Sequence, residues 1–288
     1  ALLEGGRWWN QAFEAAGYKD AFQIKMLPEG ADMLDARYNV VQWVHRSTRG
    51  WSYGANISDP RTGEIIKGHV SLGSLRIRQD FLIAQALQAP YKNNAVDDDF
   101  AMQLAIARIR QLSAHEIGHT LGFAHNFAAS TVGRTSVMDY PHPKLVMKDG
   151  KIDFSQAYDD KIGAWDKVTV AYSYQDFQED INEETALNDI LEKAFANGLR
   201  YLSDQDARPT GSASAYAHLW DNGTTVYDEL HKLLDIRKKP LPLFQKTISK
   251  QANHILCWKM FLCPCTFYIA IKLKLLLKLL VVWTTPMQ

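Results

Sequence analysis

Cysteine is absent from the first 256 residues of this 288-residue chain. The three cysteines are Cys257, Cys263 and Cys265, so the body of the protein has no disulfide of its own. Cysteine usage therefore does not identify a redox compartment. The spacing of Cys263 and Cys265 is also too short to build a zinc site from cysteines alone.

Acidic residues are missing after Asp235. The whole chain has 32 basic and 32 acidic residues, and nine of the basic ones follow Asp235. The first 235 residues therefore carry 23 basic and 32 acidic side chains, a net charge of −9. Nucleic-acid-binding proteins use basic surfaces, so an acidic body argues against a nucleic-acid partner.

The sequence also lacks a continuous apolar run long enough to cross a membrane. Residues 255–283 are apolar, but Lys272, Lys274 and Lys278 interrupt them, whereas a spanning helix needs about 20 largely uncharged residues. These lysines also point around a helix, so they leave no clean amphipathic face. We interpret residues 241–288 as a separate apolar and basic tail with a non-native end, such as a reading-frame shift. A peripheral membrane contact by this tail is the less favoured alternative.

The sequence has neither an initiator methionine nor a signal peptide. It opens directly on a pattern typical of a helix. We therefore expect this chain to be a fragment or a processed form of a longer protein.

One stretch, residues 115–125, has the pattern H-E-x-x-H-x-x-G-x-x-H. Residues four apart on a helix share a face, so His115 and His119 can direct their rings at one metal ion. Gly122 can adopt positive φ and end the helix sharply. The chain then turns back, and His125 can reach the metal from another side. Histidines that merely pack or face solvent are the alternative interpretation.

This pattern suits zinc, which binds imidazole nitrogen and prefers four ligands in a tetrahedron. Three histidines leave the fourth position for water. Zinc acidifies that water and polarises a carbonyl group. Glu116 is the predicted general base, which takes the proton as water attacks a peptide bond and then delivers it to the leaving amine.

A second motif, Ser136-Val137-Met138-Asp139-Tyr140-Pro141, follows downstream. With the histidine motif, it resembles the metzincin clan of zinc metalloproteases. The resemblance implies that Met138 is the methionine of the Met-turn, an apolar floor beneath the imidazoles and not a ligand. It also implies that Tyr140 can bind zinc at rest and then swing to hydrogen-bond the oxyanion. Ordinary core packing for Met138 and a position at the cleft rim for Tyr140 are the alternatives.

Residues 1–74 and 123–239 resemble the bacterial Met-zincin family of long secreted proteins. The similar stretches include 5–10, 125–130 and 136–141, and the resemblance covers roughly four-fifths of the chain. It implies a secreted or cell-envelope protein from which a signal and a preceding domain are missing. It also implies an α+β fold with two lobes around a cleft, spanning residues 1–240. The upper lobe, residues 1–122, would have a twisted mixed sheet with the active-site helix above it. The lower lobe, residues 123–240, would be mainly helical.

Periodicity and turn residues predict the secondary structure. Residues 38–44 are expected to form an inner strand, and residues 67–73 a strand at or near a sheet edge, where extended substrate can pair. Asp59 to Gly63 supply the turn between two further strands. The remaining predicted strands are 22–26, 56–58 and 64–66, and the predicted helices are 3–16, 100–121, 186–201 and 225–238.

Three further features have two interpretations each, and a fourth has one. His69 lies on a predicted strand, where a histidine without metal is favoured because three ligands are already present. The run Asp97 to Asp99 is either a solvated helix start or a calcium site. Asp166 either supports the site through a hydrogen bond or simply caps a helix. His142, after the second motif, is predicted to lie at the cleft rim.

The sequence thus predicts a zinc endopeptidase that acts on protein or peptide substrates. Its metal ligands are His115, His119 and His125, and its catalytic residues are Glu116 and Tyr140. Two alternatives stay open: a catalytically inactive, truncated metzincin-like binding module, and a zinc hydrolase that acts on a non-peptide amide.

Overall fold

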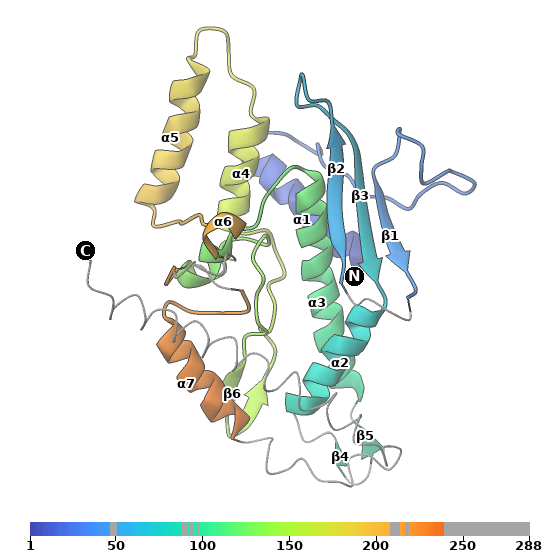
Figure 1. The fold of residues 1–288 in the computed structure, drawn as a ribbon, viewed down its shortest axis with the longest axis vertical. Coiled ribbons are helices and arrows are strands. Elements are labelled where there is room, and N and C mark those ends of the chain that lie inside the picture. The colour runs from blue at the N-terminus through green and yellow to red at the C-terminus, as the bar shows by residue number, and fades with distance from the viewer. Residues whose placement is uncertain are drawn as a thin grey trace.

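The computed structural model describes residues 1–46, 51–87, 91–92, 95–96, 98–207, 214–216 and 219–238. It has an α+β fold in which one small sheet packs against helices (Figure 1). The predicted tail, residues 241–288, lies outside the described residues. So does Asp97 of the acidic run 97–99, together with the side chain of Asp98.

The main sheet has three strands, β1 (Val40–Val44), β2 (Tyr53–Ser58) and β3 (Ile65–Gly73), in the order β1-β3-β2. β1 runs parallel to β3, and β2 runs antiparallel to it, so the sheet is mixed as expected. The prediction of an inner strand at 38–44 is wrong, because β1 is an edge strand of the described sheet. The prediction of a strand at or near the edge at 67–73 is wrong too, because these residues belong to β3, which lies in the centre. Strand propensity reports a half-buried pleated surface and not a position within a sheet.

The predicted strand at 22–26 is also wrong, since these residues form no ladder. The side chain of Ile24 lies instead against helix α1 (Leu2–Ala15) and helix α3 (Asp98–Thr120), close to Gly6 and Ile117. Phe22 packs against the same core. An alternating apolar pattern predicts a strand only if a partner strand is available, and these residues contact helices.

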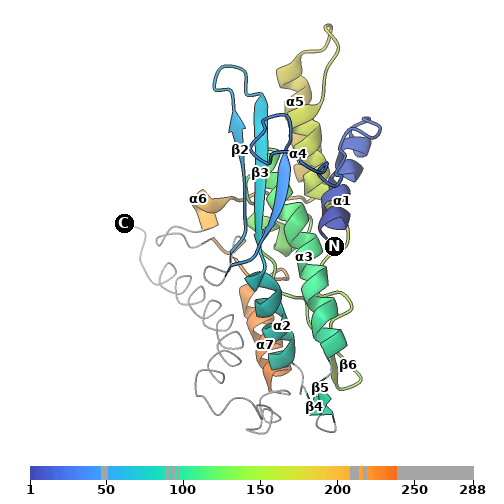
Figure 2. The ribbon, with the colours of Figure 1, turned by 90° about the vertical axis from the view of Figure 1, so that its right-hand side faces the viewer.

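The active-site helix is α3 (Asp98–Thr120), close to its predicted bounds. It contacts β2 and β3 on one side, and α1 (Leu2–Ala15) and α2 (Leu75–Leu87) elsewhere. Figure 2 shows α3 lying between the sheet and α1. Because neighbours pack against it from several directions, α3 is held rigidly in the middle of the fold.

The contact between α1 and α3 is unusually close. The indole nitrogen of Trp9 donates a 2.8 Å hydrogen bond to the carbonyl oxygen of Ala114. At Gly5, an added Cβ would lie 2.0 Å from the carbonyl oxygen of Arg110. The two backbones therefore approach each other at a distance that only glycine permits.

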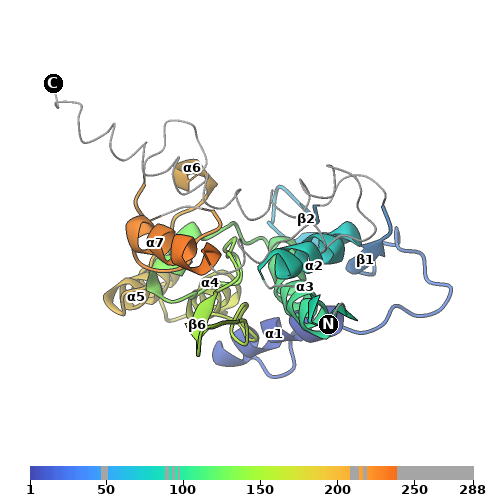
Figure 3. The same cartoon turned by 90° about the horizontal axis from the view of Figure 1, so that it is seen from below.

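Beyond α3 the chain is mostly helix and loop, which agrees with the predicted helical character of this part. Figure 3 shows these later elements beside the half that contains the sheet. The boundary between two lobes at residue 122 stays a prediction. The remaining elements are β4 (Tyr91–Lys92), β5 (Ala95–Val96), η1 (Phe127–Val132), β6 (Val146–Lys148), β7 (Lys151–Asp153), α4 (Ala164–Tyr174), α5 (Glu183–Ala196), α6 (Asp204–Ala207) and α7 (Val226–Arg237).

Within the described ranges, no helix combines the length and the apolar character needed to cross a membrane.

Replacing Gly5 by alanine should destabilise the protein. In an unconstrained helix interior the same change stabilises by up to about 1 kcal/mol. Here the new methyl group would overlap the Arg110 carbonyl, and overpacking of this kind costs about 1–3 kcal/mol. Urea unfolding of Gly5→Ala beside the wild type measures the difference, and a gain in stability would contradict the close contact between α1 and α3.

Candidate metal centre

The end of α3 is built as the sequence predicts. His115 and His119 lie on its last turns, and Gly122 follows with φ of +91°. The amide of Phe123 donates to the carbonyl oxygen of Gly118 at 3.1 Å, a bond that closes the helix end. The chain then leaves the helix axis and brings His125 back toward the other two histidines.

The three imidazole rings lie close together. One ring nitrogen from each of His115, His119 and His125 can be chosen so that all three lie within 4.8 Å of one another. The Nε2 atoms of His119 and His125 are 3.2 Å apart. The ring centroid of His115 lies 4.9 Å from that of His119 and 5.3 Å from that of His125.

The opposite nitrogens of the two helical histidines face backbone carbonyls. His115 Nδ1 lies 2.8 Å from the carbonyl oxygen of Val137, and His119 Nδ1 lies 2.8 Å from that of Phe123. A carbonyl only accepts, so each Nδ1 carries the proton and each Nε2 keeps a free lone pair. The Nε2 atom of His115 is buried and has no hydrogen-bond partner among the described residues. A buried orphan nitrogen beside two others is what a three-histidine zinc site requires.

Burial favours the neutral form of these rings. It lowers the pKa of His115 well below its usual value, and the nearby charges of His119 and His125 lower it further. Burial also lowers the pKa of His119. A metal binds only the neutral imidazole, so this environment keeps His115 and His119 in the metal-binding form over a wider pH range.

Glu116 lies under the edge strand β2. Its side chain is buried, and burial raises its pKa to about 7, against the opposing effects of the Arg108 charge and a hydrogen bond from the Gly54 amide. A Cβ at Gly54 would lie 1.9 Å from the Glu116 carbonyl oxygen. Asn56, also on β2, directs its amide toward the carbonyl oxygens of His119 and Thr120 at 3.3 and 3.4 Å. β2 therefore packs closely against the last turns of α3.

Met138 lies directly beneath the helix between the two histidines. It is 2 % exposed and belongs to the main core with Trp9. A Cβ at Gly118 would lie 2.2 Å from the Met138 sulfur. The thioether therefore packs against Gly118, and its role as the apolar floor of the metal site stays a prediction.

The sequence model of the Met-zincin family matches residues 97–260, more than half of the chain. The chain belongs to the Met-zincin family. The comparison with curated proteins gave no significant match, and neither did the comparison with solved structures. Family membership and the histidine cluster together indicate a zinc metallopeptidase-like domain.

Tyr140 of this Met-zincin faces two of the clustered rings. Its ring centroid lies 5.0 Å from that of His115 and 4.7 Å from that of His125. On its other sides it contacts Phe127 and Trp220, with centroids 5.9 and 5.6 Å away. The amide of Trp220 also donates to the Tyr140 carbonyl oxygen at 2.8 Å. Sequence spacing gave no sign of Trp220, because it lies 80 residues from Tyr140.

Asp166 both caps a helix and supports the histidine cluster, the two roles considered for it. Its carboxylate accepts from the Gly163 amide at 2.8 Å and so caps α4. It also accepts from the Ser136 hydroxyl at 2.6 Å and the Val137 amide at 2.8 Å. The carbonyl of Val137 in turn faces His115, so Asp166 supports the site through that peptide.

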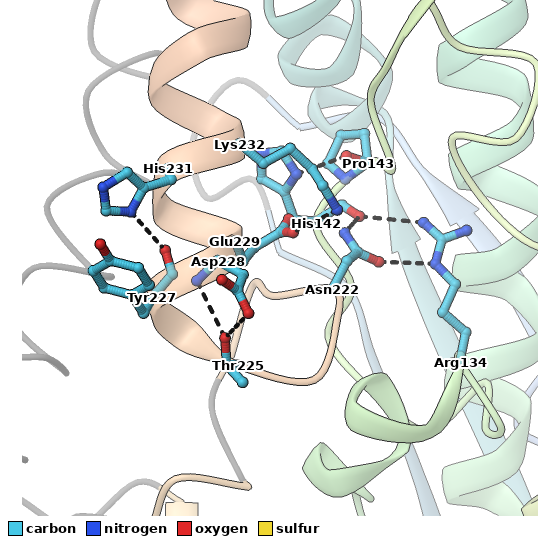
Figure 4. Close-up of polar contacts among 10 residues, drawn as sticks. All are labelled: Arg134, His142, Pro143, Asn222, Thr225, Tyr227, Asp228, Glu229, His231 and Lys232. Carbon is cyan, nitrogen blue, oxygen red and sulfur yellow. Dashed lines mark hydrogen bonds and ion pairs between the residues drawn. The ribbon is translucent and has the colours of Figure 1, made fainter.

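The prediction that His142 lies at the rim is wrong, since its side chain is 0 % exposed. Its Nδ1 lies 2.6 Å from the Pro143 carbonyl oxygen (Figure 4). The Asn222 amide donates to the His142 carbonyl at 2.6 Å, and Arg134 donates to the Asn222 side chain at 2.8 Å. A segment 80 residues later therefore covers this histidine, which no local pattern reveals.

One cluster of three or more candidate ligands occurs in the described part of the chain, and His69 does not belong to it. His69 lies on β3 opposite Val40 and Ala55.

A groove of about 910 Å³ opens beside His119. Edge strand β2 forms one wall, and the turn after α3 forms another. Its lining includes Gly54, Asn56, Ser58, Gly122, Phe123 and Tyr174. The groove therefore runs along β2 and reaches His119 of the histidine cluster.

Asp166 should make stability depend on pH. Burial raises its pKa to about 6 against an unfolded value of 3.8, so the folded protein holds a proton that the unfolded chain releases. The contribution is thus present below pH 3.8 and is lost as pH rises through about 6, a change of about 3 kcal/mol.

Asp166→Asn, which cannot titrate, is the matched reference. We expect the unfolding free energy of the wild type, relative to Asp166→Asn, to fall by about 2.4 kcal/mol between pH 4 and pH 7.5 in chelator-treated protein, because part of the full change is already lost at pH 4. A difference that does not change with pH would mean that the carboxyl group has an ordinary pKa.

Proposed function

We propose that this Met-zincin is a zinc-dependent endopeptidase. The observation that carries the proposal is the convergence of one ring nitrogen from each of His115, His119 and His125, with the buried Glu116 on the same helix and a groove that reaches His119. The three histidines would hold zinc through Nε2, because backbone carbonyls or a carboxylate occupy each Nδ1. The chemistry that zinc supplies when bound is Lewis acidity, which acidifies water and polarises a carbonyl group.

Glu116 is the proposed general base. It accepts a proton from the attacking water and passes this proton to the leaving amine. Without the metal, burial raises the pKa of Glu116 to about 7, and the charge of bound zinc would favour the ionised form, which is the form that accepts a proton. The hydrogen bond from Gly54 and the packing of β2 fix the carboxylate in one orientation.

The edge of β2 is the proposed guide for substrate. In the sheet that the structure describes, β2 pairs with β3 on one side only, and alternate residues of β2 line the groove. An extended peptide can add to such an edge, where backbone hydrogen bonds give affinity and side-chain pockets give selectivity. This arrangement favours a protein or peptide substrate over a small amide.

Tyr140 is the proposed donor to the oxyanion. Its half-buried ring lies against His115 and His125, and its neighbours Phe127 and Trp220 support it from behind. A hydroxyl held in this way stabilises charge that develops on the substrate oxygen. We further propose that residues 1–240 form the catalytic unit and that the protein works outside the cytoplasm.

Glu116→Gln should abolish cleavage while zinc stays bound. Loss of a general base costs about 100- to 10,000-fold in rate. The three histidines are untouched, so the zinc content should remain at one ion per chain. Casein hydrolysis and metal analysis on the same sample measure the two effects.

The matched control is Glu179→Gln, which removes an exposed carboxylate. It should hydrolyse casein at the wild-type rate. If Glu116→Gln is as active as this control, the base assignment is wrong. If the wild type binds zinc but cleaves neither casein nor a peptide library, the chain is an inactive binding module.

Tyr140→Phe should lower kcat by about 100-fold and leave KM nearly unchanged, because the hydroxyl acts in the transition state while the ring keeps its packing. Zinc content should stay constant. A kcat equal to that of the wild type would remove Tyr140 from the mechanism.

A further inference from the structure

The third histidine of the cluster is held differently from the other two. His115 and His119 stand on a rigid helix, and their Nδ1 atoms face carbonyls. His125 lies after the helix has ended, in the segment between α3 and η1. Its orientation must therefore come from contacts outside α3.

The ring of His125 contacts the rings of Phe127 and Tyr140, and its polar support comes from residues 200–204, which we call the strap. The amide of Phe127 donates to the Leu202 carbonyl at 2.8 Å, and the Leu202 amide donates to the Asn126 side chain at 3.2 Å. Asn126 also donates to the Arg200 carbonyl at 2.9 Å. Asn126 is 0 % exposed, so the strap is tied to the two residues that follow His125 through a buried side chain.

The strap ends at Asp204, the first residue of α6. Its carboxylate oxygen Oδ2 lies 2.5 Å from Nδ1 of His125, at a separation of 79 residues in the chain. A carboxylate accepts and does not donate, so it holds the proton of His125 on Nδ1. That leaves Nε2 of His125 directed at Nε2 of His119, 3.2 Å away.

We propose that Asp204 is a positioning residue for the metal centre: through Nδ1 it fixes the tautomer and ring orientation of His125, and it thereby sets the affinity for zinc. The inference rests on the proposed function, since it assumes that the three histidines bind zinc. A carboxylate behind a ligating histidine makes that imidazole a better donor and reduces its rotation. Loss of such a partner lowers metal affinity by about 10- to 100-fold.

The test compares three variants of the full chain. Asp204→Ala removes the acceptor, Asp204→Asn keeps an acceptor oxygen without the charge, and Asp206→Ala removes an exposed carboxylate from the same short helix. Zinc affinity is measured by competition with a chromophoric chelator. Visible absorption of the Co²⁺-substituted protein reports ligand geometry, and thermal unfolding of chelator-treated protein reports stability without metal.

We expect zinc affinity to fall about 10- to 100-fold in Asp204→Ala and less in Asp204→Asn, with no change in Asp206→Ala. The Co²⁺ bands should shift in Asp204→Ala and keep the wild-type form in Asp206→Ala. Partial rescue by asparagine also covers the case in which the alanine variant does not fold.

Two results would overturn the inference. One is a zinc affinity in both Asp204 variants within twofold of the control. The other is an unchanged Co²⁺ spectrum accompanied by a loss of stability in chelator-treated protein, which would give Asp204 a purely structural role. A wild type that binds no zinc would instead refute the proposed function, and this inference with it, so the two failures are distinguishable.

Discussion

Close packing against the C-terminal half of α3 is the constraint on which the rest of this structure depends. Three neighbours approach the helix where only glycine leaves room: α1 at Gly5, β2 at Gly54, and the Met138 sulfur at Gly118. Each contact comes from a different part of the chain. Together they fix the helix in position and rotation, and so fix the two histidines that it carries.

The polar supports of the histidine cluster follow from that framework. Val137 is held by Asp166 and presents its carbonyl to His115, so a buried carboxyl group acts on the ring through one peptide. His119 uses the carbonyl of Phe123, which the turn at Gly122 places within reach. Helix, turn and neighbouring loop therefore orient two of the rings locally, whereas the third ring depends on the distant Asp204.

Burial acts on the acid and on the bases of the site in the same sense, toward neutrality. It raises the pKa of Glu116 to about 7 and lowers the pKa of His115. Neither charged form is well solvated by the protein alone. A site of this kind gains from a divalent cation, because neutral imidazoles are the ligands that such an ion needs and its charge favours the ionised glutamate.

The sequence by itself determined which residues make up the candidate metal site and much of the local structure around them. Helical spacing places His115 and His119 on one face, next to Glu116 in the chain, and the glycine after them marks the end of the helix. The later methionine belongs to the second motif. These relations lie within a few residues, so periodicity and turn chemistry reveal them. Helix α3, the turn at Gly122 and the strand–turn–strand unit around residue 60 were predicted for that reason.

Only the tertiary structure decided which distant segments meet. It placed β1 at the sheet edge, left residues 22–26 without a strand partner and buried His142 under Asn222. It also brought Asp204 to His125 and Trp220 to Tyr140. A hydrogen bond between residues 79 positions apart leaves no periodic trace in the sequence, because it depends on how whole elements pack and not on the spacing of neighbours along the chain.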